Sequence, residues 1–517
     1  MPQRMAYPAS RGAVFVAADG SGADGGEDLR PELADVRRLG HRLLQRAVRT
    51  ARHEDNPIGR LLREHLGPGA AGLPLVGGSW LQYDHVNVQL GLEAWLAQAG
   101  RRHDVTGLTG FRHSDFGLAD LMQPGRFAQH FGIGNVATVA IPAGPGGRTR
   151  SCVRCGVYLV SEREARYALL LRSPDEHHPM AEITLEVVAR DSERAEQIVA
   201  EVRALAVKHN VYRGNVISFG GEMFGHGRGA LLTFLDRPQV ARRDVVLPDG
   251  VLAGVERQVL GVQRHSGRLR ASGQHLKRGV LLHGAPGTGK THTIGYLMGQ
   301  LPQATIVILT GAALEMIGQA CSVARLLQPS VVIVEDVDLI AEQRTPHFGP
   351  HPLLFQLLNE MDGLGEDIDV TFLLTTNRPD MLERALADRP GRVDHAAELP
   401  LPDGDGRRRL LQLYQGRLEL DLADPDTVIE RTEGVTASFL KELLRKAALF
   451  AAEDPDEDGR SEDDRPLRVT DAHMSLALDE LLGTRNQLTR LLLGGQSAGQ
   501  GNPGAPAGPP APPATRP

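Results

Sequence analysis

The sequence is poor in cysteine, in aromatic residues and in long apolar runs. Only 3 of its 517 residues are cysteines, which is too few for a disulfide framework. Aromatic residues make up 4% of the chain, and no apolar run approaches the roughly 18 to 20 residues that cross a bilayer. The apolar patch near the N-terminus is too brief for a secretory signal. We therefore expect a cytoplasmic protein without a membrane span.

Two of the cysteines, Cys152 and Cys155, form an isolated CxxC pair. A zinc site would need two further ligands, and the nearest candidates, His177 and His178, are adjacent residues without ligand spacing of their own. A pair of buried or half-exposed thiols at a strand edge is favoured over a metal site. Cys321 is expected in the core.

Lysine is also scarce, and the overall charge is acidic. The chain has five lysines among 57 basic residues and a formal net charge of −7. An acidic balance provides no bulk attraction for nucleic acid, so a nucleic-acid motor is disfavoured. The length is sufficient for roughly three domains of about 150 residues each.

One of the five lysines lies in a phosphate-loop motif. The segment HGAPGTGKT at 283–291 matches GxxxxGK[ST], follows an apolar run and precedes a helical pattern. The alternative, a Gly/Pro-rich turn that happens to carry a lysine, explains poorly why a scarce residue falls at this position. The predicted nucleotide-binding residues are Gly284, Ala285, Pro286, Gly287, Thr288, Gly289, Lys290, Thr291 and His292.

The chemistry of a bound triphosphate accounts for these residue types. Glycines accept unusual dihedral angles and let backbone N–H groups approach the phosphates closely. The helix after the loop directs its first amides and its dipole at the same group. Lys290 is expected to reach the β and γ phosphates, and the Thr291 hydroxyl is expected to bind Mg²⁺. ATP with Mg²⁺ is therefore the predicted ligand.

Upstream of the motif, the sequence predicts a separate N-terminal unit of helices and strands over residues 31–244, which we interpret as a recognition domain. A disordered N-terminus at 1–30 precedes this unit, whose expected parts include helices at 31–53 and 56–66 and a Gly-rich loop without a lysine at 220–229. Between 136 and 219 the predicted strands are VATVAIP, GVYLV, ARYALLLR, AEITLEVVAR and NVISF, with a helix capped by Ser192.

Two acidic residues follow an apolar strand beyond the phosphate loop. Glu335 and Asp336 come directly after Val331–Val334, a run typical of a buried parallel strand. Open α/β sheets bind their ligands at the carboxyl ends of such strands. The alternative, two carboxylates that cap the next turn, is weak because a phosphate-loop motif lies upstream.

From Val245 to about Leu482 the sequence resembles the AAA+ ATPase module. The resemblance rests on the entry to the phosphate loop, EDVDLI at 335–340, LLFQLLNEMDGLGED before the strand VTFLLTTN, and ERALADRPGRVD. It implies that Glu335 and Asp336 form the Walker B element, in which one acid organises Mg²⁺ and the next polarises the attacking water. The usual Asp-Glu order is reversed, as in AAA proteins related to the mitochondrial complex III assembly ATPase. Candidate Mg²⁺ ligands are Thr291, Glu335 and Asp336.

The resemblance also implies a sensor and two arginine fingers. Asn377 falls where the family's sensor 1 asparagine contacts the γ-phosphate or the lytic water. Arg389 and Arg392 align with the fingers, whose forked and permanently charged groups grip phosphate oxygens in a neighbouring subunit. One extra residue, Asp388, precedes the RPGR element. Fingers that act in trans imply a ring, which this family builds as a hexamer.

Two further segments are interpreted through the same resemblance. The helical pattern after residue 400 resembles the small lid of AAA modules, with Leu440, Leu443, Leu444 and Ala447 on one face. Met316-Ile317-Gly318 occupies the place of the aromatic pore loop of threading relatives, and its methionine could still grip an unfolded chain. The predicted ranges are a large ATPase subdomain at 245–400, a lid at 401–494 with a solvated acidic insert at 453–465, and a disordered tail at 495–517.

These patterns predict an α/β fold: a P-loop NTPase with a three-layer parallel sheet and a C-terminal helical lid, preceded by a separate α/β N-terminal domain. The predicted activity is Mg²⁺-dependent ATP hydrolysis by a homo-hexameric, chaperone-like ring that remodels a protein partner. The alternative is a nucleotide-gated scaffold or regulatory switch with slow turnover.

Overall fold

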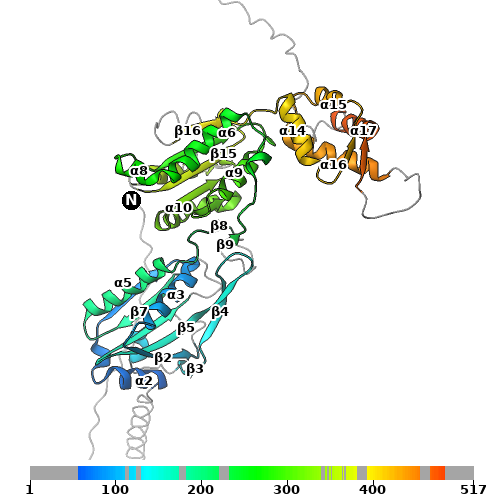
Figure 1. Cartoon of the computed structure of the whole chain (residues 1–517). Coiled ribbons are helices and arrows are strands. Elements are labelled where there is room, and N and C mark those ends of the chain that lie inside the picture. Colours follow the sequence, from blue (N-terminus) through cyan, green and yellow to red (C-terminus); the bar gives the residue numbers. More distant parts are fainter. Residues whose placement is uncertain are drawn as a thin grey trace, which may run out of the picture.

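A computed structural model of the chain describes twelve ranges of residues. They are 56–110, 116–123, 130–173, 182–220, 232–338, 344–345, 349–350, 352–363, 365, 368–380, 393–453 and 466–483. The predicted start, the helix at 31–53, Arg389 and Arg392, the acidic insert after Glu453 and the tail lie outside these ranges. Figure 1 shows the N-terminal unit below a central sheet and the lid to the right of that sheet.

The N-terminal unit is built on an antiparallel sheet. Its strand order is β1-β7-β6-β5-β2-β3, and β4 also pairs with β5. Alternate residues of β6 pack on opposite faces: Leu169 and Leu171 on one, Ala168 and Leu170 on the other. The strands are β1 (Leu75–Trp80), β2 (Arg101–Leu108), β3 (Ile133–Gly134), β4 (Ala137–Pro142), β5 (Thr149–Glu162), β6 (Ala165–Arg172) and β7 (Ile183–Val188).

Helices cover both faces of this sheet. The helices α3 (His85–Leu96) and α5 (Ser192–Lys208) pack on one face, and α2 (Pro57–Leu66) and α4 (Leu118–Met122) on the other. The prediction that Ser192 caps α5 is wrong. Asp191 is the cap because its backbone is extended and its carboxylate accepts the Arg194 N–H at 2.7 Å.

The two cysteines of the CxxC pair point into different clusters. Cys152 packs into the cluster shared with the central sheet, whereas Cys155 packs under α2 and α4. Both are on β5. Cys155 pairs with β4 and β6, so the predicted strand edge is wrong for it, whereas the register pairs Cys152 with β4 alone. Burial raises the pKa of the Cys152 thiol to about 11 and that of Cys155 to about 12. Two protonated thiols in separate clusters are inert packing groups.

The central sheet has the strand order β16-β10-β15-β12-β11-β8-β9. All neighbouring strands are parallel except β8 and β9. The strands are β8 (Val216–Phe219), β9 (Leu232–Leu235), β10 (Arg278–His283), β11 (Thr305–Leu309), β12 (Ser330–Val334), β15 (Val370–Thr376) and β16 (His395–Glu398). The segment NVISF, predicted within the N-terminal unit, is β8 and extends this sheet because its backbone pairs with β11.

Helices on both faces make three layers, as predicted. On one face, α6 (Asp249–Glu256) and α9 (Lys290–Gly299) share a buried cluster with Val280 and Leu282 of β10. On the other, α10 (Ile317–Leu326) and α12 (Pro352–Asp362) pack on Leu281. Cys321 of α10 is 1% exposed, which confirms its predicted place in the core.

The lid has its own hydrophobic core. Its helices are α14 (Gly404–Tyr414), α15 (Pro425–Arg431), α16 (Ala437–Glu453) and α17 (Asp471–Leu482). The predicted apolar face of α16 is confirmed, since its four residues Leu440, Leu443, Leu444 and Ala447 are buried. The lid also contains a short parallel pair that was not predicted, β17 (Glu419–Asp421) with β18 (Arg468–Thr470). Within the described residues, the structure contains no helix long and apolar enough to span a bilayer.

One hydrophobic cluster joins the N-terminal unit to the central sheet. Val86 of α3, Cys152 of β5 and Tyr212 are at most 3% exposed and belong to the same cluster as Leu281 and Val334. Because protein cores are closely packed, contacts of this kind hold two units in a fixed relation.

Arg237 lies just after β9, the edge strand of the central sheet, and connects this strand to α9, the helix that follows the phosphate loop. Its guanidinium donates to the carbonyl oxygens of Met298 and Leu301 at 2.8 and 2.9 Å, and of Gly214 and Ala304 at 3.0 Å. The first two lie at the C-terminal end of α9, where the helix dipole favours a cation. Burial lowers the pKa of this arginine.

We expect Arg237→Ala to lower the free energy of unfolding by about 2–4 kcal/mol, because it leaves several half-buried carbonyls without a donor. Urea denaturation followed by circular dichroism measures the effect. Arg243→Ala is the control, since the Arg243 side chain is 89% exposed and is expected to change stability by less than about 0.5 kcal/mol. An equal loss of unfolding free energy in both variants would contradict the stabilising role of the Arg237 hydrogen bonds.

Candidate nucleotide site

The loop from Gly284 to Gly289 joins the end of β10 to the start of α9. Gly284, Gly287 and Gly289 have φ of 148°, 80° and 98°, values that side chains with a Cβ rarely adopt. A Cβ on Gly284 would lie 2.5 Å from the Leu399 oxygen. The predicted loop therefore needs glycine for both its dihedral angles and its close approach to neighbours.

Lys290 is folded back onto its own loop. Its Nζ donates to the carbonyl oxygens of Gly284 at 2.8 Å and Ala285 at 3.0 Å, and the residue is 7% exposed. Burial lowers its pKa, and the carboxylates of Asp336 and Asp338 oppose that shift. A buried ammonium with only carbonyl partners is well placed to exchange them for phosphate oxygens.

The two Walker B acids face different partners. The Thr291 side chain lies near enough to the Glu335 carboxylate to favour its charged form. Burial raises the Glu335 pKa, the Thr291 side chain opposes the rise, and the neighbouring Asp336 carboxylate adds to it. Asp336 accepts from the Asn377 amide, with Nδ2 to Oδ1 at 3.2 Å. The structure thus brings Thr291 to the first acid and Asn377 to the second.

Asp338 fixes the strand end that carries Asn377. This carboxylate is 8% exposed and accepts from the Thr376 hydroxyl at 2.8 Å and from the Asn377 N–H at 3.3 Å. Asp338 belongs to the segment EDVDLI that resembles the AAA+ module, but no role was predicted for it. Its partners lie 38 and 39 residues further along the chain, so local sequence carries no signal for them.

The lid contacts the phosphate loop directly. The Ser438 N–H donates to the Gly287 oxygen at 3.2 Å, and the Ser438 hydroxyl lies 3.4 Å from the same oxygen. A Cβ on Gly287 would approach both Ser438 and Thr436 within 3.0 Å. Sequence reasoning missed these two hydroxyl residues, because only the folded arrangement brings α16 to the loop.

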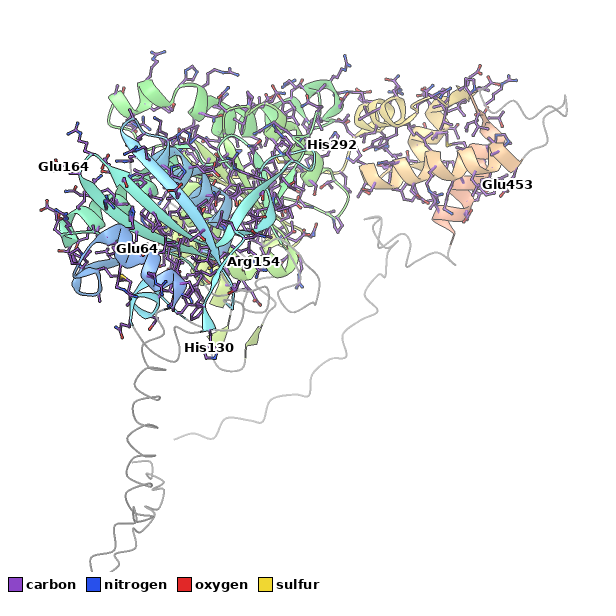
Figure 2. All side chains as sticks on the ribbon, turned by 90° about the horizontal axis from the view of Figure 1, so that it is seen from below. Glu64, His130, Arg154, Glu164, His292 and Glu453 are labelled. Carbon is purple, nitrogen blue, oxygen red and sulfur yellow. The ribbon has the colours of Figure 1, made fainter. Side chains whose placement is uncertain are left out.

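His292 lies in the first turn of α9 and contacts the segment that precedes α6. Its Nε2 is 3.1 Å from the Asp244 oxygen, and the side chain is exposed. Figure 2 shows His292 on the side of the ATPase unit that is nearer to the lid. This contact connects α9 to the short 3-10 turn at Arg242–Asp244, which precedes α6.

The pore-loop position does not form a projecting loop. Ile317 is fully buried and begins α10, and Met316 is partly buried against the same core cluster. Ile317 is therefore not available to a substrate, whereas the partly exposed Met316 keeps its role in gripping an unfolded chain as a prediction.

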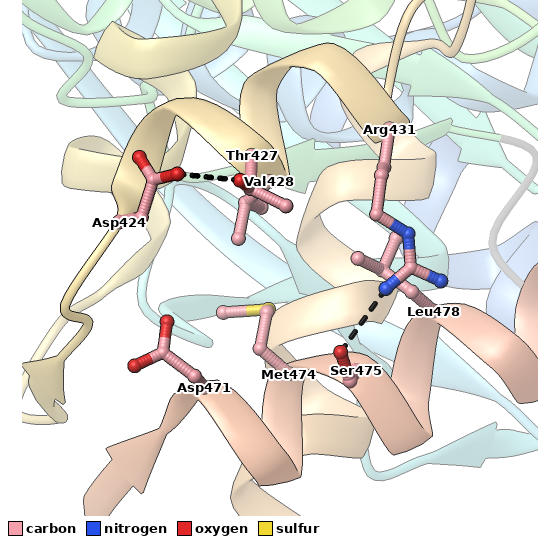
Figure 3. A pocket seen from close by; sticks show the side chains of 8 residues that line it. All are labelled: Asp424, Thr427, Val428, Arg431, Asp471, Met474, Ser475 and Leu478. Atoms are coloured by element: carbon pink, nitrogen blue, oxygen red, sulfur yellow. Dashed lines mark hydrogen bonds between the residues drawn. The ribbon is translucent and has the colours of Figure 1, made fainter.

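A separate cavity of about 120 Å³ lies in the lid between α15 and α17 (Figure 3). Its polar groups already have partners: the Thr427 hydroxyl donates to Asp424 at 2.6 Å and Arg431 donates to Ser475 at 3.1 Å. None of the predicted site residues lines it. The lining residues are Asp424, Thr427, Val428, Arg431, Asp471, Met474, Ser475 and Leu478.

Comparison with known proteins agrees with this geometry. Residues 280–401, from β10 to just beyond β16, match the family model described as ATPase family associated with various cellular activities (AAA). The match confirms the predicted resemblance and the P-loop α/β fold.

Curated relatives match about half of the chain. It is 29% identical over 272 residues to the proteasome-activating nucleotidase of Thermococcus gammatolerans, covering 50% of this chain and 66% of that protein. It is 30% and 32% identical over 288 and 292 residues to the ATP-dependent zinc metalloprotease FtsH of Rhodococcus erythropolis and Mycobacterium leprae. Those alignments cover 53% of this chain and 32% and 35% of the relatives. The chain thus spans less than two thirds of each relative's length.

Proposed function

Because the chain belongs to the AAA+ ATPases, we propose that it binds ATP with Mg²⁺ at the phosphate loop and hydrolyses it to remodel a protein partner. The observation that carries this proposal is the convergence of Lys290, the Thr291–Glu335 pair and the Asp336–Asn377 pair at one edge of the sheet. This place is at the carboxyl ends of the parallel strands, where open α/β sheets bind their ligands.

The residues at this edge fit Mg²⁺. Thr291 and Glu335 offer a hydroxyl and a carboxylate oxygen, the hard donors that Mg²⁺ prefers, and the two side chains are neighbours. When bound between ATP and these oxygens, Mg²⁺ would neutralise charge that develops on the phosphates. The Lys290 ammonium would hold the β and γ phosphate oxygens on the other side.

The partners of the two acids support a division of roles in spite of their reversed order. Glu335 takes the metal side because it lies near Thr291. Asp336 takes the water side, where its carboxylate oxygen orients the attacking water and accepts its proton. The Asn377 amide donates to that carboxylate and holds it in place.

Assembly and partner handling are extensions of the same proposal. We propose a homo-hexameric, chaperone-like ring in which Arg389 and Arg392 act on the neighbouring subunit's ATP. A protein substrate is supported by the names of the relatives, one a proteasome activator and the other an ATP-dependent protease. The N-terminal unit would recognise the partner. These 517 residues contain no HExxH motif, so we do not propose a fused zinc protease. A cytoplasmic location is part of the proposal.

Steady-state ATP turnover tests the proposal, measured alone, with a permanently unfolded protein and with duplex DNA. We expect turnover that requires Mg²⁺ and that rises with unfolded protein. Acceleration by DNA but not by protein would contradict the remodeller. Slow turnover that responds to neither would favour the nucleotide-gated switch.

A further inference from the structure

The Asp336 N–H is bound by a side chain of the neighbouring strand. The main-chain pairing of β12 with β15 ends where Val334 lies opposite Leu374. Two residues later, the Asp336 N–H donates to the Thr375 Oγ1 at 3.0 Å. Thr375 is 2% exposed, so water cannot readily replace this acceptor.

Asp336 has a left-handed backbone. Its φ is +52°, and the other non-glycine residue with positive φ in the described part of the chain is Arg163, in the turn between β5 and β6. This conformation is disfavoured for residues with a Cβ, although aspartate tolerates it better than most. It persists only where surrounding contacts impose it.

The left-handed residue separates two consecutive carboxylates. In an extended strand, successive side chains alternate between the two faces of the sheet. Here the chain leaves β12 at Glu335, which lies near Thr291, and turns at Asp336, which contacts Asn377. The aim of the Asp336 carboxylate therefore depends on the contact that holds its peptide.

We propose that Thr375 is a positioning residue for ATP hydrolysis, whose hydroxyl holds the Asp336 peptide so that the Asp336 carboxylate faces Asn377 and the attacking water. This inference rests on the proposed ATPase function and adds the group that aims the water-side acid. The next residue, Thr376, acts in parallel through Asp338, which holds the Asn377 N–H. The end of β15 thus positions both members of the Asp336–Asn377 pair.

Three variants of β15 test this role. Thr375→Val keeps the side-chain shape and removes the acceptor, whereas Thr375→Ser keeps the hydroxyl. Thr371→Val makes the same change at a 6% exposed threonine at the start of the strand and is the control for packing. The measurements are kcat and KM for ATP, the Kd of a fluorescent ATP analogue, and the thermal midpoint.

We expect T375V to lower kcat by about 10- to 100-fold, because a small misplacement of a catalytic group costs rate. The Kd is expected to stay within about twofold, since the phosphate loop is unchanged. T375S is expected to recover kcat to within about threefold of the wild type, and T371V to match it. If T375V does not fold, Thr375→Ala removes the same acceptor and is measured instead.

A wild-type kcat in T375V, or an equally slow T375S, would overturn the role of Thr375 while the proposed ATPase stands. Loss of nucleotide affinity in step with kcat would also overturn it, because it would indicate a general structural role. Absence of turnover in the wild-type chain would overturn the proposed function and this inference together, so the two failures are distinguishable.

Discussion

Replacing Asp336 with Asn is expected to leave ATP bound and to lower its turnover by about 10²- to 10³-fold. Asparagine keeps the size of the side chain and can still pair with Asn377, but it cannot accept a proton from water. Binding of a fluorescent ATP analogue and steady-state phosphate release measure the two effects separately. The resulting ATP-bound protein is also suited to capture a partner.

Glu335→Gln is the matched comparison, because it makes the same chemical change one residue earlier. Glu335 lies near Thr291 on the metal side. We therefore expect E335Q to raise the Mg²⁺ concentration needed for half-maximal turnover, an effect that D336N should not show. If D336N shifted the Mg²⁺ requirement and E335Q did not, the roles of the two acids would be exchanged.

Replacing Lys290 with Ala is expected to weaken ATP binding by about 10²-fold or more, because charge-assisted hydrogen bonds contribute about 1.5–3 kcal/mol each and at least two are lost. Lys290 is the cation that faces the loop carbonyls of Gly284 and Ala285. Titration with the fluorescent ATP analogue measures the loss directly. Turnover is expected to fall to the background of the assay.

Lys208→Ala is the control for Lys290→Ala, since Lys208 is an exposed lysine at the end of α5. It is expected to bind and hydrolyse ATP like the wild type. Thermal midpoints of both variants establish that they are folded. Near-normal ATP affinity in K290A would contradict the assignment of the phosphate loop and the function built on it.

The phosphate loop and the place of the two acids at the end of a sheet strand were predictable for a physical reason. The glycines, Lys290 and Thr291 are close together in sequence because one loop and one helix start must surround the phosphates. Likewise, Glu335 follows a run of buried strand residues, and the end of a parallel strand is a fixed place in the fold. Local sequence is informative where a site is local.

The features that were missed depend on pairing between distant segments. β8 is a short apolar strand, and nothing within it indicates that its partner is β11 rather than another strand of the N-terminal unit. The contacts of Thr375 with Asp336 and of Ser438 with Gly287 join segments 39 and 151 residues apart. Hydroxyl groups of this kind look like those of ordinary strand and helix-start residues until the fold brings their hydrogen-bond partners near.

The pore-loop position shows what a family resemblance leaves open. The resemblance places Met316-Ile317-Gly318 where threading relatives have an aromatic pore loop, and here Ile317 is buried and begins a helix. Its side chain packs with Leu314, Ala320 and other buried residues of the core cluster.

The cluster that Val86, Cys152 and Tyr212 share with Leu281 and Val334 has a mechanical consequence. An N-terminal unit joined only by a flexible linker would move independently, so a force exerted by a partner would not reach the central sheet. Here the shared core makes the connection rigid, so a force applied to the N-terminal unit is transmitted to the central sheet, whose strand β12 is followed by Glu335 and Asp336. The part of the subunit that moves most easily relative to the central sheet would then be the lid, which folds around a core of its own.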